Sequence, residues 1–202
     1  MFKIDMHIHS ILGHDSIIAP DELVFFAQKA GMDAVCITEH HSFEISAPFD
    51  LISQKSGFPI IRGMEYKAQE GHLLVFGINM GRADMPPQMP MQHVIDWVAD
   101  KGGIGIPAHP YQPDMFGKML GDRLLSFENV VAVEAANGSA SMIENKTAEK
   151  AADLMGWRKT GGSDAHGPES IGKAYTVFPH RITTPSQLVQ ALKTTDYYPE
   201  TV

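Results

Sequence analysis

The chain has 202 residues, of which 44% are hydrophobic and 20% are charged. This composition is typical of a folded globular domain rather than a disordered chain, and we expect one domain over residues 1–202. The net charge of −8 argues against sequence-independent binding of duplex nucleic acid, which needs a basic surface. A small phosphorylated substrate held locally by metal ions remains compatible with it.

The sequence also indicates the cellular setting. The one cysteine, Cys36, cannot form an internal disulfide, which suits a reducing compartment, and its apolar neighbours favour burial over reactivity. The N-terminus lacks the pattern of a signal peptide, and no apolar run approaches the roughly 20 residues needed to span a bilayer. We therefore expect a cytoplasmic protein that does not bind membranes. Its oligomeric state is left open.

Strand-like and helix-like segments alternate along the chain. Apolar or alternating runs predict strands within residues 3–8, 33–38, 58–66, 72–78, 104–109, 128–138, 158–166 and 174–178. Apolar residues at helical spacing between capping residues predict helices over residues 20–31, 91–103, 142–156 and 184–195. This order predicts an α/β fold with a largely parallel sheet covered by helices, either closed into a barrel or open and doubly wound. The Met- and Pro-rich residues 81–92 are predicted to form a connecting loop.

Two histidines one residue apart, in DMHIHS at residues 5–10, raise the question of a functional site. On a strand, Asp5, His7 and His9 share one face and the apolar residues between them share the other. Neutral imidazole is the commonest side-chain metal ligand, so the pair forms either half of a metal site or two hydrogen-bonded histidines. An H-x-H pair alone favours the second interpretation, and the rest of the chain must decide.

Further histidines and carboxylates fall at or near the ends of predicted strands, where α/β sheets and barrels build their sites. They are Asp15, His40, Glu65, His72, His109, Asp164 and His166. With His7 and His9 the set holds six imidazoles and three carboxylates, too many for one ion. Mixed nitrogen and oxygen ligands favour Zn, Mn or Fe over Mg or Ca. We therefore predict two or three divalent transition-metal ions, which would activate water for displacement at phosphorus.

The spacing of Glu65 and His72 constrains the local topology. Only six residues separate them. If both lie at one end of the sheet, the strand that begins at His72 must run back from that end. We therefore expect a departure from parallel strand order at this point.

The motifs DMHIHS, ITEHH, the region of Glu65, PAHP and GGSDAH resemble, in this order, those of the PHP (polymerase and histidinol phosphatase) family. The resemblance runs from residue 5 to about residue 170. It implies a distorted seven-stranded (β/α) barrel, up to three metal ions and hydrolysis of phosphate esters. Carried over by position, it implies that the metal ligands are His7, His9, Asp15, His40, Glu65, His72, His109, Asp164 and His166. Among these, we expect His40, His109 and Asp164 to act in catalysis.

Other residues near these motifs receive different roles. Many family members have Asp where Glu39 stands, and we expect Glu39 to orient a ligand. Our candidates for substrate binding are His14, His41, Lys118 and Arg123.

Glu134 and Asn137 follow another predicted strand. We expect Glu134 to be a core carboxylate paired with a lysine, and Asn137 to be a turn residue. His93, in a predicted helix, is expected to be structural.

The predicted function of this free-standing chain is hydrolysis of a small phosphate monoester, such as a nucleotide or a compound like histidinol phosphate, by metal-activated water. No serine-nucleophile or Walker motif suggests a covalent intermediate or a nucleoside triphosphate site. One alternative is an exonuclease or oligonucleotide-trimming enzyme on the same metals. A second is a metal-bearing regulatory domain without turnover, against which the complete ligand set argues. A third is metal-dependent C–N bond hydrolysis, against which the lack of a ligating lysine at a strand end argues.

Overall fold

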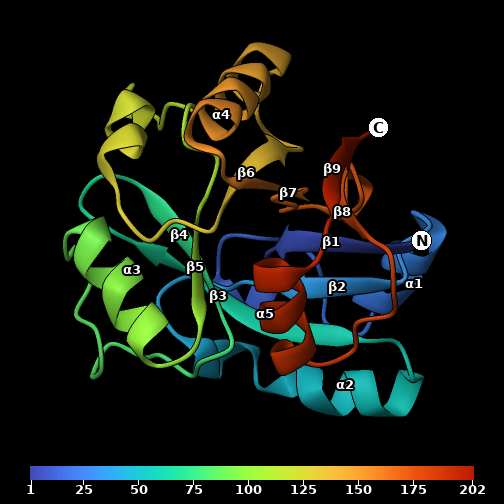
Figure 1. Cartoon of the computed structure of the whole chain (residues 1–202). Coiled ribbons are helices and arrows are strands. Elements are labelled where there is room, and N and C mark those ends of the chain that lie inside the picture. Colours follow the sequence, from blue (N-terminus) through green and yellow to red (C-terminus); the bar gives the residue numbers. More distant parts are fainter.

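The computed structural model describes residues 1–202 and contains nine strands and five α-helices (Figure 1). The strands are β1 (Phe2–Ile8), β2 (Ala34–Ile37), β3 (Ile60–Lys67), β4 (His72–Phe76), β5 (Ile104–Pro107), β6 (Ala132–Asn137), β7 (Arg158–Gly162), β8 (Ala174–Phe178) and β9 (Tyr198–Thr201). The α-helices are α1 (Leu23–Lys29), α2 (Pro48–Ser56), α3 (Met91–Asp100), α4 (Met142–Met155) and α5 (Pro185–Thr194). Short 3₁₀ helices occur at Ile11–Gly13, Phe43–Ser46, Gly121–Ser126 and Pro168–Ser170.

Local capping explains where the predicted helices begin and end. Helix α4 begins with a capping box, in which the Ser141 hydroxyl accepts from the amide of Glu144 and the Glu144 carboxylate accepts from the amide of Ser141. It ends at Gly156, whose φ of 69° is left-handed. Helix α5 begins after Thr184, whose hydroxyl accepts from the amide of Gln187.

Two elements were not predicted from the sequence. Helix α2 buries only one side chain, Phe49, so it lacks the apolar periodicity that identifies an amphipathic helix. Strand β9 pairs only with β8 at the edge of the sheet and contains Pro199, a residue that sheets tolerate at edges. In both cases the surrounding structure, rather than the local pattern, determines the conformation.

The main sheet has seven strands in the order β5-β4-β3-β2-β1-β8-β9, and β6 and β7 form a separate parallel pair. The predicted α/β class is confirmed. The expected parallel order holds for β1, β2 and β3 and for β6 with β7, whereas β4, β8 and β9 run antiparallel to their neighbours. Residues 68–71 are too few for a parallel crossover, so β4 returns as a hairpin in which Lys67 pairs with His72. This is the departure expected from the spacing of Glu65 and His72.

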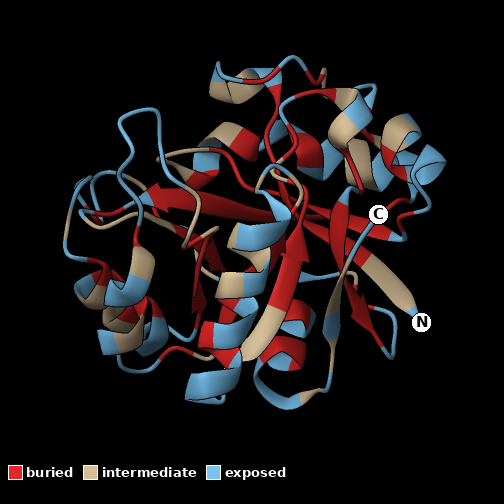
Figure 2. Cartoon of the chain, turned by 90° about the horizontal axis from the view of Figure 1, so that it is seen from above, coloured by how far each residue is buried: buried red, intermediate tan, exposed pale blue.

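Helices cover the curled sheet from several sides. Helix α2 packs on β3, α5 on β3 and β4, α3 on β5, and α4 on β6 and β7, with α4 above the β6–β7 pair in Figure 1. The β6–β7 pair also contacts β5 and β1, which brings the two ladders together. The strands are mostly buried, while the helices expose their outer faces (Figure 2). No helix combines the length and the apolar character that crossing a bilayer requires.

Two glycines allow β7 to lie close to β1 and β8. A Cβ atom on Gly162 would lie 2.5 Å from the Cβ of His7, and one on Gly161 would lie 2.6 Å from the carbonyl oxygen of Tyr175. Beyond β7, Ala165 pairs with Ile8 in an isolated parallel bridge. Because glycine has no Cβ atom, β7 can approach β1 closely, and residues 163–166 then lie beside the end of β1.

A buried carboxylate joins these same segments. Asp5 is fully buried, and its two oxygens accept from the backbone amides of Ser163 and Gly172, each at 2.8 Å. Burial raises the pKa of Asp5 to about 6, against the opposing effect of these hydrogen bonds. Asp5 thus joins β1 to the segments that follow β7 and precede β8.

Replacing Asp5 with asparagine is expected to destabilise the fold. An amide offers one acceptor oxygen, so the amide of Ser163 or Gly172 loses its partner while buried. We expect the free energy of unfolding, measured by urea denaturation with chelator present, to fall by about 1–3 kcal/mol. Asp100→Asn, at the exposed end of α3, serves as control and should change it by less than about 0.5 kcal/mol. Equal stability of Asp5→Asn and wild type would contradict this role.

Candidate functional site

The nine residues predicted as metal ligands lie together at one end of the strands. Their nitrogen and oxygen atoms form three groups, each within 4.8 Å, composed of His7, His9 and Glu65; of Glu65, His72 and His109; and of His9, Asp15, His40 and His166. The ninth, Asp164, places Oδ1 3.4 Å from Nε2 of both His7 and His9. The fold therefore gathers segments that span residues 7 to 166.

Glu65 is shared by two of these groups and lies at the centre of the cluster. Its side chain is 2% exposed, and five imidazole nitrogens approach its two oxygens, two of them from β1 and its end, and one each from the segment after β2, the start of β4 and the segment after β5. The distances are 3.3 Å from His7 Nε2, 3.2 Å from His9 Nε2, 3.2 Å from His40 Nδ1, 2.8 Å from His72 Nδ1 and 3.1 Å from His109 Nε2. One carboxylate cannot accept hydrogen bonds from five rings in good geometry.

Unmatched nitrogen atoms show that this cluster fits metal ions. Nδ1 of His40 and Nδ1 of His72 are buried and make no hydrogen bond, although each lies within 3.2 Å of a Glu65 oxygen. Two ligand atoms on one tetrahedral zinc ion lie roughly 3.4 Å apart, given bonds of about 2.1 Å. For His72, which shares a ligand group with Glu65, close approach without hydrogen-bond geometry is what two ligands of a common ion display. The donor set of imidazole and carboxylate suits Zn, Mn or Fe.

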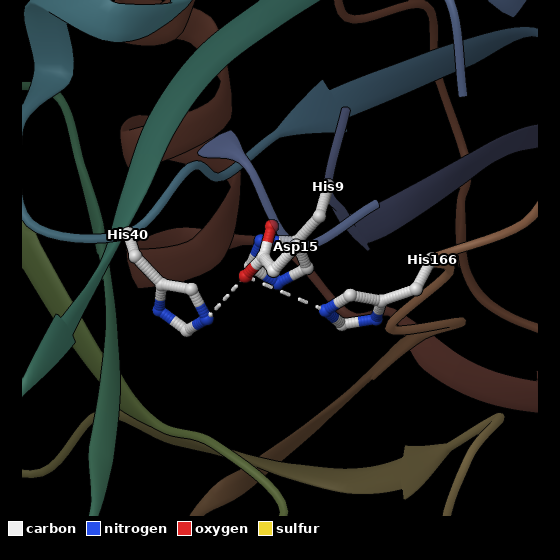
Figure 3. Close-up of side chains that lie close together, drawn as sticks. All are labelled: His9, Asp15, His40 and His166. Atoms are coloured by element: carbon white, nitrogen blue, oxygen red, sulfur yellow. Dashed lines mark ion pairs between the residues drawn. The ribbon is translucent and has the colours of Figure 1, made fainter. Parts of the chain in front are cut away.

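The third group lies around Asp15, on the loop after β1 (Figure 3). Its Oδ2 atom lies 3.1 Å from Nε2 of His40 and 3.7 Å from Nε2 of His166. Figure 3 shows these two rings on either side of the carboxylate, with the ring of His9 behind it. The Asp15 and His166 side chains are 34% and 41% exposed, so this group is the most open to solvent.

Two buried carboxylates of the cluster, Glu65 and Asp164, strongly favour their charged form. Burial raises the pKa of Glu65, but the imidazoles, with His72 and His7 foremost, outweigh it and hold that pKa well below its ordinary value. Burial likewise raises the pKa of Asp164, and His7 and His9 reverse the effect and lower it. Buried negative charge therefore accumulates at the cluster and requires compensating positive charge.

The imidazoles differ in whether the neighbouring carboxylates outweigh the effect of burial on the pKa. Burial lowers the pKa of His7, but Asp164 and the adjoining glutamates raise it well above its ordinary value. For His9, burial is outweighed by Asp164 and Glu65, which raise the pKa to about 9. Burial dominates at His40 and lowers its pKa to about 4. The deepest rings thus face a negative field that protons or divalent cations can neutralise.

Glu134 supports the cluster, a role that the sequence interpretation missed. No lysine pairs with it. Its Oε1 lies 3.0 Å from Nδ1 of His7, and its Oε2 accepts from the backbone amide of His109 and from Nδ2 of Asn137, each at 2.9 Å. A hydrogen bond at Nδ1 leaves Nε2 of His7 as the nitrogen that faces the cluster. The available signal was the position of Glu134 near the end of a buried strand.

Glu39 has a different role from the one expected. Its side chain is buried, and its Oε1 accepts from both the backbone amide and the hydroxyl of Ser10. It makes no hydrogen bond to an imidazole of the cluster, so it holds the turn after β1 rather than orienting a ligand directly.

Backbone strain is concentrated around the cluster. Of six non-glycine residues with positive φ, four are His14, His41, His109 and Asp164, with φ of 70°, 70°, 27° and 52°. Such conformations cost free energy and persist where the surrounding structure enforces them, often at functional sites.

A cavity of about 400 Å³ opens beside the cluster, and His40, Glu65, His72, His109, Asp164 and His166 line it. Of the four predicted substrate-binding residues, only Lys118 lines this cavity. Arg123 is exposed on the 3₁₀ helix Gly121–Ser126, His14 is exposed at the end of Ile11–Gly13, and His41 is half-buried beside His40. Cavity-lining residues that the sequence did not single out include Lys67, Gln88 and Gln112.

The contact between Glu134 and His7 predicts a specific defect. In Glu134→Gln the amide can donate to Nδ1 of His7, which moves the proton to Nε2 and blocks that nitrogen. We expect zinc affinity, measured by competition with a chromophoric chelator, to fall about 10- to 100-fold. Glu128→Gln, at an exposed position, is the matched control and should bind zinc as wild type does. Unchanged affinity in Glu134→Gln would refute the positioning role.

Comparisons with known proteins identify the family and the fold of the chain. Residues 5–148 match the family model of the PHP domain, and residues 142–196 match the PHP-associated model. An uncharacterized protein of Methanocaldococcus jannaschii is 28% identical over 136 residues, which cover 62% of this chain and 77% of the relative.

Two crystal structures share the fold. A two-domain protein from Bacteroides vulgatus, which contains a predicted PHP-like metal-dependent phosphoesterase, matches 99% of this chain with a TM-score of 0.74 and 21% identity. This chain spans 64% of that longer protein. An amidohydrolase from Chromobacterium violaceum with bound sulfate and no metal matches 94% of this chain and 96% of its own, with a TM-score of 0.68 and 19% identity. On the family match over residues 5–148, the chain belongs to the PHP domain family.

Proposed function

We propose that this protein is a metal-dependent phosphoesterase that hydrolyses a small phosphate monoester. The observation that carries the proposal is the buried Glu65 carboxylate, which two ligand groups share and which unmatched imidazole nitrogens surround. The description of the Bacteroides vulgatus relative as containing a predicted metal-dependent phosphoesterase supports it. We also infer that the curled sheet and the β6–β7 pair correspond to the distorted (β/α) barrel that the family resemblance implies.

Two or three divalent ions, Zn, Mn or Fe, would be held by the three ligand groups. We assign the first to His7, His9, Glu65 and Asp164, the second to Glu65, His72 and His109, and the third to Asp15, His40 and His166. When bound, such ions lower the pKa of water and neutralise charge on phosphoryl oxygens.

The chain itself supplies orientation and proton transfer. Lys67 and Lys118 line the cavity, where their ammonium groups can hold phosphate oxygens. Both ring nitrogens of His40 face carboxylates, those of Glu65 and Asp15, whereas His109 uses only Nε2 in this way. We therefore assign proton transfer to the leaving oxygen to Nδ1 of His109, which has no carboxylate oxygen within 4.0 Å and stays free when Nε2 binds an ion. Asp164, whose Oδ2 accepts from the hydroxyl of Ser139 at 2.9 Å, keeps a fixed orientation towards His7 and His9.

The alternatives have less support. A cavity of about 400 Å³ suits a small ligand better than the strand that an exonuclease follows, and a regulatory domain has no need of a complete ligand set. The amidohydrolase name of the Chromobacterium violaceum structure favours C–N bond hydrolysis as the second candidate. Lys67 and Lys118 are the lysines that line the cavity, and both are exposed rather than buried among the ligands.

Metal removal tests the proposal. We expect purified protein to contain two or three transition-metal ions per chain, to hydrolyse an aryl phosphate, to lose turnover with chelator and to regain it with Mn or Zn. His72→Ala should lose metal by elemental analysis and more than about a hundredfold in kcat. His93→Ala, exposed on α3 away from the cluster, is the control and should retain both. Turnover that survives complete chelation, or reconstituted protein that hydrolyses no phosphate ester, would contradict the proposal.

A further inference from the structure

One wall of the cavity carries large exposed apolar side chains, although the metal-ligand cluster that also lines the cavity is polar. Residues 113–119, here called the rim loop, line this wall except for Gly117. The rim loop carries Met115 and Phe116, which are 89% and 86% exposed, and Met119, which is 46% exposed. These large apolar side chains therefore share one cavity with His72 and His109.

The rim loop has an ordered backbone. The Oδ1 atom of Asp114 accepts from the amides of Phe116 and Lys118, each at 2.9 Å, and the amide of Asp114 donates to the carbonyl of Lys118 at 2.8 Å. Nζ of Lys118 donates to the carbonyl of Gln69, in the turn between β3 and β4. These bonds hold the loop against the hairpin that carries Glu65 and His72, so Met115 and Phe116 extend from a fixed turn.

Apolar groups of this size at the edge of a polar cavity indicate a contact with an apolar ligand group. Clustered apolar surface commonly marks a binding site, aromatic rings stack on one another, and methionine sulfur packs well against rings. Other exposed apolar residues, such as Phe25 on α1 and Ile143 on α4, do not line this cavity. Because Phe116 lines the same cavity as the ligand cluster, we infer that the group it contacts belongs to the substrate.

We propose that the rim loop recognises the leaving group, with Met115 and Phe116 binding a flat apolar ring of a phosphate monoester whose phosphoryl group lies at the ligand cluster. This inference rests on the proposed function, and it narrows the substrate class to phosphate esters of alcohols that carry an aromatic ring. Lys67 and Lys118, which also line the cavity, attract the anionic end.

Binding of unreactive analogues tests the inference separately from catalysis. Benzylphosphonate and ethylphosphonate share an anionic group and differ in the ring. Calorimetry on the manganese-loaded full chain should show benzylphosphonate binding about tenfold more tightly. Phe116→Ala, at a position that is 86% exposed and so does not hold the fold together, should abolish this preference. Phe25→Ala removes an exposed ring outside the cavity and should keep it.

Hydrolysis provides the second measurement. Benzyl alcohol and ethanol are leaving groups of similar acidity, so the kcat/KM ratio of benzyl phosphate to ethyl phosphate reports recognition rather than reactivity. We expect Phe116→Ala to lower this ratio about tenfold and Phe25→Ala to leave it unchanged.

The outcomes separate the two proposals. Equal binding of both phosphonates by wild type, no binding of either, or a preference that survives Phe116→Ala would overturn the role of the rim loop and leave the hydrolase proposal standing. A ring preference in binding that depends on Phe116, without hydrolysis of either ester, would support the ligand class and overturn the phosphoesterase.

Discussion

The site depends on one constraint, which is that the negative charge of a buried carboxylate must be compensated. Placing Glu65 in the sheet removes its charge from water, and an unpaired buried charge is costly. Five imidazoles from four segments approach it within 3.3 Å. Those segments belong to β1, β2, β4 and β5 or their ends, so the strand order of the sheet and the position of Glu65 are linked. The hairpin of β3 and β4 follows from the same requirement, because it is what places His72 beside Glu65.

A second set of buried polar groups keeps the cluster in place. Glu134 contacts His7 and the backbone of His109, Asp5 joins the segments on either side of Asp164, and Glu39 holds Ser10. Each is a buried carboxylate bonded to backbone amides or to a ligand ring, which is how a protein keeps ligands near working geometry before an ion binds. Gly162 leaves room for His7, since a side chain at position 162 would displace it.

The residues proposed to bind metal ions and those proposed to recognise the leaving group belong to different parts of the fold. Apart from Asp15, on the loop after β1, the ligand residues lie on strands or just beyond their ends, whereas the large apolar side chains of the cavity come from the rim loop. Loops vary more readily than the sheet that supports them. A change in the rim loop can therefore alter the preferred leaving group while the Glu65 cluster stays intact.

The sequence was informative where the local pattern and the final structure agree. H-x-H, Glu65 and S-D-x-H lie at strand ends, and strand ends meet in this class of fold, so their convergence followed from simple topology. His14, His41 and Arg123 lie near the motifs along the chain but outside the cavity, because adjacency in sequence does not determine which way a loop side chain extends. Glu134 was misjudged because its partner, His7, lies 127 residues away, and no local pattern encodes that contact. Helix α2, with one buried side chain, was missed for a similar reason.

Anomalous diffraction from crystals prepared with zinc or manganese tests the central claim most directly. Data collected at the metal absorption edge locate each ion independently of any assay. We expect an ion on each side of the Glu65 carboxylate, one within coordinating distance of His7 and His9 and the other within coordinating distance of His72 and His109. Anomalous density that is absent from Glu65, in protein shown to contain the metal, would contradict the account.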